Sequence, residues 1–177
     1  YNPLFIHGEA GLGKTHLLQA IENYIHENYP SHSTRYVSTE TFLNEFIEAI
    51  RKNNRAEFKS RYREIDVLLM DDIQFLEGKE GLQEEFFHTF NTLFEYKKQV
   101  VLTSDKYPKE IVGLEERIKS RLVWGMSVTI DPPDLETRIA ILHGKAEAVN
   151  QKIPDDVAYY LAKNVYSNVR ELEGSLR

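Results

Sequence analysis

Short apolar runs alternate with longer segments of helical periodicity through residues 1–130. Five of the short runs are predicted to be strands. They lie within residues 3–8, 34–39, 67–70, 99–105 and 126–130. The third run, VLLM, has no polar position, which is typical of a strand that is covered on both faces of a parallel sheet.

Between these runs, apolar residues recur at helical spacing. The helical segments lie within residues 14–29, 41–50, 82–96 and 115–125. Strands that alternate with helices of this length predict an α/β fold with a parallel sheet built from βαβ units. From the DPPD sequence at Asp131 onward, only helical patterns appear. We therefore predict an α/β subdomain over residues 1–130 and a small, incomplete helical subdomain over residues 131–177.

The composition narrows the classes of protein that fit. With 41% hydrophobic and 28% charged residues among 177, the chain resembles an ordinary globular protein. No apolar run approaches the ~20 residues that span a bilayer, and no cysteine is present for a disulfide or a thiolate metal site. Without a signal peptide, a cytoplasmic location is the default expectation. The chain has no initial methionine and stops within a helical pattern, so we expect it to be part of a longer protein.

Residues 51–63 form a basic segment in a chain whose formal net charge is −6. Against the single acid Glu57, its six cations are Arg51, Lys52, Arg55, Lys59, Arg61 and Arg63. Phe58 and Tyr62 are interleaved with them, and charge combined with aromatic rings suits a nucleic-acid backbone. An ordinary solvated face is the alternative, because most runs of charge have that role.

GEAGLGKT at residues 8–15 fits the phosphate-binding pattern G-x-x-x-x-G-K-[ST], and it lies between a predicted strand and a predicted helix. The glycines that allow the backbone N–H groups to face phosphates are Gly8, Gly11 and Gly13. Lys14 is expected to neutralise the β- and γ-phosphates, and the Thr15 hydroxyl to bind magnesium. His16, the next residue, completes the predicted nucleotide-binding set. The sequence therefore predicts ATP or ADP and Mg²⁺ as ligands.

Two adjacent aspartates, Asp71 and Asp72, follow the VLLM run. Ligands of open α/β sheets bind at the carboxyl ends of the strands, and Mg²⁺ takes one or two carboxylates beside phosphates. We therefore interpret Asp71 as the magnesium carboxylate and Asp72 as the group that polarises the water attacking the γ-phosphate. Because many related ATPases carry the longer glutamate at the second position, we expect slow turnover, suited to a timed switch. A pair of solvated turn residues is the alternative interpretation.

The LTSD sequence at residues 102–105 ends another predicted strand. If the sheet places this strand between the phosphate loop and the Asp71 strand, Asp105 or Ser104 reaches the γ-phosphate and the attacking water. A turn at a strand end, without a role in chemistry, is the alternative.

Arg117 and Arg121 lie four residues apart and so share a helical face. We expect the apolar Ile118, Leu122 and Trp124 to pack inward, which leaves Arg121 pointing away from the surface of the domain. An ordinary solvated basic face is the alternative.

Arg170 falls in the first turn of a predicted helix that Ser167 or Asn168 caps. The helix dipole disfavours a cation at this position, which suggests an anionic ligand such as a phosphate. A surface salt bridge with Glu171 or Glu173 is the alternative.

Seven stretches, spread over essentially all 177 residues, are more specific than a lone phosphate loop. They are NPLFIHGEAGLGKTHLLQAI, LLMDDIQFL, EEFFHTFN, VVLTSDKYPKEI, RIKSRLVWG, DPPDLETRIAIL and SNVRELEGSL. Together they resemble the ATPase domain of the bacterial replication initiator family DnaA. The resemblance implies an AAA+ P-loop fold with a helical lid, and ATP-dependent head-to-tail assembly on origin DNA. It also implies that Asp105 is the sensor 1 residue, Arg121 the arginine finger, Arg117 the box VII arginine and Arg170 the sensor 2 arginine.

The resemblance further implies that the segment from about residue 42 to residue 63 is the family's initiator-specific helical insertion, which touches single-stranded DNA in the assembled filament. Ile47 and Lys79 match positions that the family uses there, and we add Lys52 and Arg55 from the basic segment as candidates. Some members carry arginine in place of Gly81, which weakens the match at that contact.

These features predict an ATP-dependent initiator of chromosomal replication with slow hydrolysis as its off-switch. The expected partners are single-stranded DNA, origin DNA, further copies of the chain and a replicative helicase or its loader, at the nucleoid in the cytoplasm. In the family, an adenine-contacting segment precedes the equivalent of Tyr1, and a helix-turn-helix domain for duplex DNA follows that of Arg177.

Three other functions remain open. They are a helicase-loader or regulatory paralogue with the same core, a metabolic P-loop kinase, and a module that holds ATP without hydrolysing it. A C-terminal helix-turn-helix in the full-length gene separates the initiator from the paralogue. Phosphorylation of a small acceptor would identify a kinase, and turnover by an Asp72→Asn variant separates hydrolysis from simple binding.

Overall fold

The computed structural model describes residues 1–176, which form two compact units. The first unit contains Tyr1–Gly8 and Lys14–Thr129, and the second contains Glu9–Gly13 with the residues from Ile130 onward. Each unit has its own cluster of buried apolar side chains.

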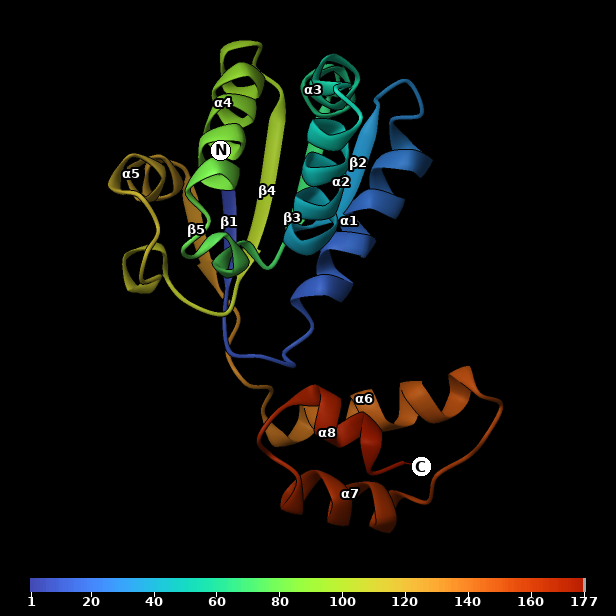
Figure 1. Ribbon diagram of the computed structural model, residues 1–177. Coiled ribbons are helices and arrows are strands. Elements are labelled where there is room, and N and C mark those ends of the chain that lie inside the picture. The colour runs from blue at the N-terminus through green and yellow to red at the C-terminus, as the bar shows by residue number, and fades with distance from the viewer. Residues whose placement is uncertain (177) are drawn as a thin grey trace. The chain divides into compact units, whose positions relative to one another are not determined.

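A parallel sheet of five strands forms the centre of the first unit (Figure 1). The strands are β1 Leu4–His7, β2 Thr34–Ser38, β3 Val67–Asp71, β4 Gln99–Ser104 and β5 Met126–Thr129. Their order is β2-β3-β4-β1-β5, and all neighbouring pairs are parallel. The register sets Ser38 against Asp71 and His7 against Ser104, so these strands end at one edge of the sheet. The predicted parallel sheet is confirmed, and β4 does lie between β3 and the strand that precedes the glycine-rich loop.

Helices cover both faces of this sheet. They are α1 Lys14–Asn28, α2 Thr39–Arg51, α3 Arg55–Arg63, α4 Glu80–Glu95 and α5 Glu116–Trp124, with the short 3₁₀ helices η1 Ile73–Leu76 and η2 Pro108–Glu110. Phe5, Leu68 and Leu102 belong to a core that also contains apolar residues of α2 to α5. Because side chains alternate along a strand, the buried Ile6 and Leu69 face the other way, where α1 contacts β2, β3 and β4.

Two helices of the first unit show how local sequence sets their bounds and packing. The side chain of Ser38 accepts the Thr41 N–H at 3.1 Å, and this cap lets α2 begin at Thr39, slightly before the predicted Thr41. In α4, the buried residues of the predicted stripe are Leu82, Phe86, Phe90 and Leu93. The stripe therefore packs against the sheet core, as its periodicity predicted.

The second unit contains three helices around a small apolar core. They are α6 Leu135–Ala148, α7 Asp155–Asn164 and α8 Val169–Gly174. Leu142, Ala158, Ala162 and Leu172 are fully buried there. Of the two caps considered for α8, the structure has Asn168, whose Oδ1 accepts the Glu171 N–H at 2.8 Å. Within residues 1–176, no helix is both long enough and apolar enough to cross a membrane.

Candidate nucleotide site and basic segment

The glycine-rich loop connects the end of β1 to the first residue of α1. Gly8 donates its N–H to the Ser104 carbonyl at 3.3 Å, which ties the start of the loop to β4. Gly11 and Gly13 have φ angles of 81° and 94°, a region that residues with a Cβ rarely adopt. The loop backbone therefore requires glycine at these two positions, as a phosphate cradle does.

Within the second unit, the same loop contacts the start of α8. The Gly11 carbonyl accepts N–H groups from Val169 and Arg170 at 3.1 and 3.3 Å. A Cβ on Gly11 would lie 2.8 Å from Asn168 Oδ1, so a side chain there would displace the cap of α8. This close approach is a second reason for glycine at residue 11.

Lys14 has a buried side chain in the first turn of α1. Its Nζ donates to the Gly8 carbonyl at 2.7 Å, which offsets part of the cost of burying an ammonium group. The loop thus holds a desolvated positive charge, and such a charge interacts strongly with an anion such as phosphate. Thr15 and His16 follow in the same turn and are exposed.

Asp71 is 3% exposed at the end of β3, and hydroxyl groups surround it. Thr15 Oγ1 and Tyr36 OH donate to its Oδ2 at 2.6 and 3.1 Å, and Thr103 Oγ1 donates to its Oδ1. The Thr39 hydroxyl donates to its backbone carbonyl at 3.0 Å. Burial, and then the charge of Asp71, raise the pKa of Tyr36 to about 12, so the phenol remains a donor at neutral pH. The structure therefore brings together Thr15 and Asp71, the two residues predicted to hold magnesium.

Sequence reasoning missed Tyr36, Thr39 and Thr103. Each lies in or next to a strand whose register with β3 is known only from the fold. Hydroxyl residues near the carboxyl ends of β2 and β4 could have indicated these contacts with Asp71, but many strands end in such residues.

Asp72 follows with a left-handed backbone, φ 57° and ψ 53°, which is uncommon for a residue other than glycine. Its N–H donates to Thr103 Oγ1 at 3.0 Å, and Gln74 Nε2 donates to its Oδ1 at 3.1 Å. Asp105, after β4, donates its N–H to Gln74 Oε1 at 3.4 Å. Its Oδ1 is buried and has no hydrogen-bond partner among the described residues. One glutamine thus links the carboxylate of Asp72, the candidate water-polarising group, to the backbone of Asp105, the candidate sensor residue.

The oxygen donors at this edge fit Mg²⁺ bound together with a nucleotide. Among residues 1–176, no group of three or more histidine, cysteine or acidic side chains is placed to hold a metal by itself. Mg²⁺ usually takes one or two carboxylates and completes its octahedron with water and phosphate oxygens. Asp71 with the Thr15 hydroxyl is a donor set of that kind.

The two arginines of α5 lie over aromatic rings. The Arg117 guanidinium is 4.5 Å from the centroid of Phe87, and that of Arg121 is 5.3 Å from Trp124 and 5.8 Å from Phe94. Arg121 is half-exposed and, within residues 1–176, makes no ion pair.

The prediction that Trp124 packs inward was wrong, because its side chain is 71% exposed. Ile118 and Leu122 are buried as predicted, and Trp124 follows Leu122 by two residues. Residues two apart on a helix do not share a face, so the inner face of α5 ends at Leu122.

Arg170 lies in the first turn of α8 and is exposed. The salt bridge considered as its alternative role is not formed by the described residues. Glu173 pairs with Lys145 at 2.8 Å, while the Glu171 carboxylate accepts the Ser167 hydroxyl.

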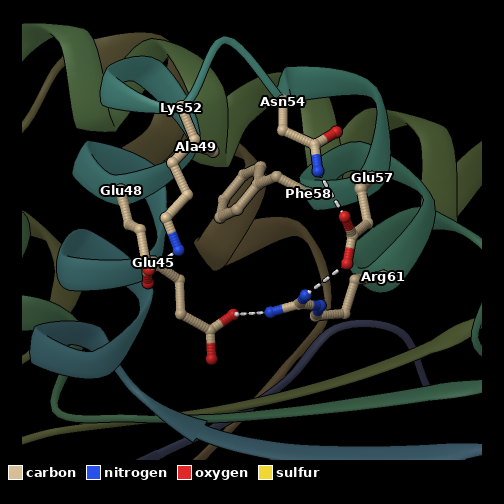
Figure 2. A pocket seen from close by; sticks show the side chains of 8 residues that line it. All are labelled: Glu45, Glu48, Ala49, Lys52, Asn54, Glu57, Phe58 and Arg61. Carbon is tan, nitrogen blue, oxygen red and sulfur yellow. Dashed lines mark hydrogen bonds and ion pairs between the residues drawn. The ribbon is translucent and has the colours of Figure 1, made fainter.

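The basic segment runs from the end of α2 through α3, and half of its cations pair with acidic residues. Figure 2 shows Lys52 and Arg61 among their acidic neighbours. Lys52 pairs with Glu48 at 2.6 Å, and Arg63 with Glu85 at 2.6 Å. Arg61 contacts both Glu45 and Glu57, at 3.2 and 2.9 Å. The remaining cations, which form no ion pair within the described residues, are Arg51, Arg55 and Lys59. The local excess of positive charge is therefore smaller than the sequence suggested.

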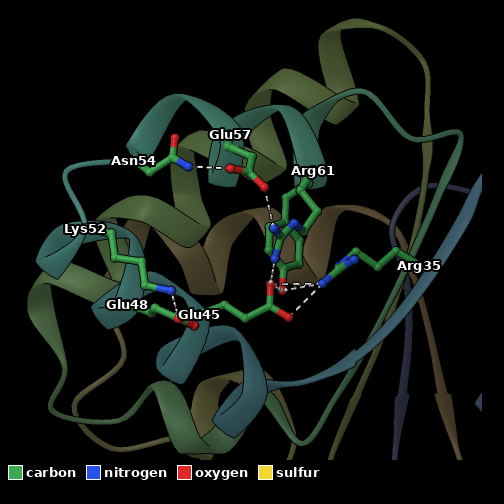
Figure 3. A network of polar contacts seen from close by, with 8 residues as sticks. Arg35, Glu45, Glu48, Lys52, Asn54, Glu57 and Arg61 are labelled. Atoms are coloured by element: carbon green, nitrogen blue, oxygen red, sulfur yellow. Dashed lines mark hydrogen bonds and ion pairs between the residues drawn. The ribbon is translucent and has the colours of Figure 1, made fainter.

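Glu45 is the centre of this network (Figure 3). Its carboxylate accepts from Arg35 on β2 at 2.8 Å, and from Tyr62 and Arg61 on α3 at 2.8 and 3.2 Å. A polar cavity of about 170 Å³ lies beside it, between α2 and α3. Its lining is Glu45, Glu48, Ala49, Lys52, Asn54, Glu57, Phe58 and Arg61. Glu45 thus joins the two helices to the edge strand of the sheet.

The two other residues predicted to contact single-stranded DNA lie in different settings. Ile47, on α2, is 37% exposed. Lys79 occupies the N-cap position of α4 without a side-chain cap, and its Nζ donates to the Phe75 carbonyl at 2.5 Å.

The sheet order, the glycine-rich loop after β1 and the carboxylates that end β3 and follow β4 define a P-loop NTPase of the AAA+ class. The model of the bacterial DnaA ATPase domain family matches residues 1–129. The chain belongs to this family.

Solved structures agree over nearly the whole chain. Domain III of the replication initiation protein DnaA from Thermotoga maritima is 43% identical with a TM-score of 0.97, over 99% of this chain and 74% of that one. AMPPCP-bound DnaA from Aquifex aeolicus is 41% identical with a TM-score of 0.89, over 99% of this chain and 54% of that one. A replication initiator DnaA bound to AMPPCP and single-stranded DNA gives the same values. The chain therefore spans little more than half the length of the latter two proteins.

Proposed function

We propose that this chain is the ATP-binding and ATP-hydrolysing part of a bacterial replication initiator, and that slow hydrolysis is its off-switch. The observation that carries the proposal is the hydrogen bond between Thr15 Oγ1 and Asp71 Oδ2, at 2.6 Å. It joins the first turn after the glycine-rich loop to the carboxylate at the end of β3. The relatives bound to AMPPCP support the same assignment of ligand.

In the proposed complex, the loop N–H groups and Lys14 bind the phosphates, while Thr15 and Asp71 hold Mg²⁺. When bound, the ion neutralises charge on the β- and γ-phosphates. Asp72 orients the attacking water and accepts its proton, and Asp105 contacts the water or the γ-phosphate from the next strand end. Because an aspartate reaches less far than a glutamate, the water is held loosely and turnover is slow.

Assembly is the second part of the proposal. Arg121 is half-exposed and makes no ion pair with a described residue, which suits a contact with the γ-phosphate of a neighbouring copy. Such a head-to-tail interface is heterologous, and it generates an open helical filament when its rotation does not close. Arg170 then senses the nucleotide within its own subunit, and Arg117 is the next candidate for the contact in trans.

The assembled form would engage origin DNA and single-stranded DNA at the nucleoid in the cytoplasm, with a replicative helicase or its loader as a further partner. The relative bound to single-stranded DNA supports this part of the proposal. The candidate contacts are Ile47, Lys52, Arg55 and Lys79.

Two substitutions separate binding from hydrolysis. Lys14→Ala removes the ammonium that faces the phosphates, so ATP affinity should fall by ~100-fold or more. Asp72→Asn should keep ATP and Mg²⁺, because Asp71 and Thr15 remain, while hydrolysis is lost. Calorimetric titration of ATP and phosphate release measure the two effects, with Lys109→Ala, at an exposed lysine of η2, as the control. Near-normal ATP affinity in a folded Lys14→Ala variant would refute the nucleotide site, and normal turnover in Asp72→Asn would refute the role of Asp72.

A further inference from the structure

Gln74 uses both ends of its side-chain amide to join two loops at the carboxyl edge of the sheet. It lies in η1, directly after β3. Its Nε2 donates to Asp72 Oδ1 at 3.1 Å, and its Oε1 accepts the N–H of Asp105 at 3.4 Å. The residue therefore spans from the end of β3 to the end of β4.

The chemistry of the two partners permits only one orientation of this amide. A carboxylate such as that of Asp72 can only accept, and a backbone N–H such as that of Asp105 can only donate. A primary amide supplies both functions. Glutamate at residue 74 would keep the acceptor and lose the donor, and leucine would lose both.

Asp72 depends on this contact for the placement of its carboxylate. Its backbone is held in the left-handed region, and its N–H is bound to Thr103 Oγ1 at 3.0 Å. Thr103 also donates to Asp71, so the backbone at Asp72 is tied to the candidate magnesium carboxylate. Within the part of the chain that the structure describes, Gln74 is the one side chain that donates to the Asp72 carboxylate. Thr103 thus fixes the backbone at Asp72, and Gln74 fixes its side chain.

We propose that Gln74 is a positioning residue for ATP hydrolysis, acting through Asp72 and Asp105; this inference rests on the hydrolysis proposed above. In that reaction the water oxygen bonds to the γ-phosphorus. The bond from that phosphorus to the β–γ bridging oxygen breaks with its electron pair left on ADP, and the water proton passes to Asp72. Gln74 donates to Oδ1 of Asp72, which leaves Oδ2 to accept the proton. Through the Asp105 N–H, it also holds the chain after β4 in place relative to that carboxylate.

The test compares Gln74→Leu and Gln74→Glu with the parent and with Asp72→Asn. Loss of orientation at a reacting group costs on the order of 100-fold in rate. We therefore expect kcat to fall ~10- to 100-fold in both Gln74 variants, with Kd for ATP and ADP unchanged. Amide hydrogen exchange at Asp105 should quicken in Gln74→Leu and stay slow in Gln74→Glu, which keeps the acceptor. Gln19→Leu, at an exposed glutamine of α1, is the control.

Three outcomes would overturn the inference. If Asp72→Asn loses turnover while either Gln74 variant keeps parental kcat, the positioning role alone is wrong. If Asp72→Asn itself keeps turnover, Asp72 is not the base, and the role of Gln74 is refuted together with that part of the proposed function. If both Gln74 variants lose nucleotide affinity by the same factor as kcat and also melt at a lower temperature than the parent, Gln74 serves only to hold the fold.

Discussion

Carboxylates accept hydrogen bonds both at the carboxyl edge of the sheet and in the pair of helices α2 and α3, here called the α2–α3 hairpin. The donors differ between the two regions. Asp71 at the sheet edge accepts from the neutral hydroxyls of Thr15, Tyr36 and Thr103. Glu45 in the hairpin accepts from two arginines as well as from one phenol. Neutral donors leave the charge of the carboxylate available to a cation, whereas arginines cancel it. The difference suits a binding site at the sheet edge and a structural joint in the hairpin.

Burial adds a second contrast between these regions. Asp71 is 3% exposed, whereas the ion pair between Lys52 and Glu48 joins side chains that are 71% and 60% exposed. Exposed pairs contribute little to stability, because water and salt screen them. Changes at the sheet edge should therefore have larger effects than changes in the hairpin, and within the hairpin Glu45 should matter most.

Among the variants that compare these two regions, Asp71→Asn should have the largest effect. The substitution removes the charge and brings an NH₂ group to a place where three hydroxyls already donate. We expect ATP affinity measured with Mg²⁺ to fall ~10- to 100-fold, while affinity in the presence of a chelator stays near that of the parent. Titrations of ATP with and without Mg²⁺ measure this difference.

Asp66→Asn is the matched control for that experiment. Asp66 precedes β3 at the opposite end of the strand, and it pairs with Lys98 at 2.7 Å. Its hydrogen bonds to Lys98 and Ser33 hold the pKa of its carboxyl well below the usual range, so its substitution should lower the stability of the fold. Because Asp66 lies at the other end of β3, the Mg²⁺ dependence of ATP binding should not change. If Mg²⁺ enhanced ATP binding equally in Asp71→Asn and in the parent, Asp71 would not be the magnesium carboxylate.

Next in size should be the effect of Glu45→Gln on folding. The variant loses charge-assisted hydrogen bonds from Arg35 and Arg61, so the free energy of unfolding should fall by ~1–3 kcal/mol. Urea unfolding measures it, and faster hydrogen exchange in α3 should accompany the loss. ATP affinity should be unchanged. Parental stability in Glu45→Gln, or a larger loss in Glu48→Gln, would show that Glu45 is not the joint between α2 and α3.

The elements of the fold followed from the sequence because each depends on local periodicity. Strand β3 is an uninterrupted apolar run, α4 has a continuous stripe, and the glycine-rich loop fits one pattern between a strand and a helix. The proximity of Thr15 and Asp71 followed too, because parallel strands end at one edge of the sheet.

What the sequence did not predict depends on register and on partners from distant segments. Tyr36 and Thr103 meet Asp71 only because β2 and β4 flank β3 in one register. The charge count over residues 51–63 did not include Glu45 and Glu85, which belong to other parts of the chain. Tertiary contacts thus completed the site and reduced the charge of the basic segment.

The smallest effect should be that of Glu48→Gln on binding of single-stranded DNA. Glu48 pairs with the Lys52 ammonium at 2.6 Å, and their hydrogen bond raises the pKa of Lys52 above its usual value. Without this competitor, Lys52 is free to contact a phosphate. We expect slightly tighter binding by the ATP-assembled protein, and a slope of log K against log[salt] that is steeper by ~0.7 for one added contact with a single strand.

Two further variants decide whether the basic segment binds DNA or is an ordinary solvated face. Lys52→Ala should flatten the slope, and Glu48→Gln combined with Lys52→Ala should behave as Lys52→Ala alone, because Glu48 acts only through that lysine. Glu40→Gln, at an exposed acid in the first turn of the same helix, removes an equal charge without releasing a lysine and controls for the change in net charge. If Glu40→Gln steepens the slope as much as Glu48→Gln does, the effect is long-range and Lys52 makes no contact. If neither the lysine nor the acid variant changes the slope, the segment is solvated, and the ion pair of Arg61 with Glu45 serves only to hold α2 against α3.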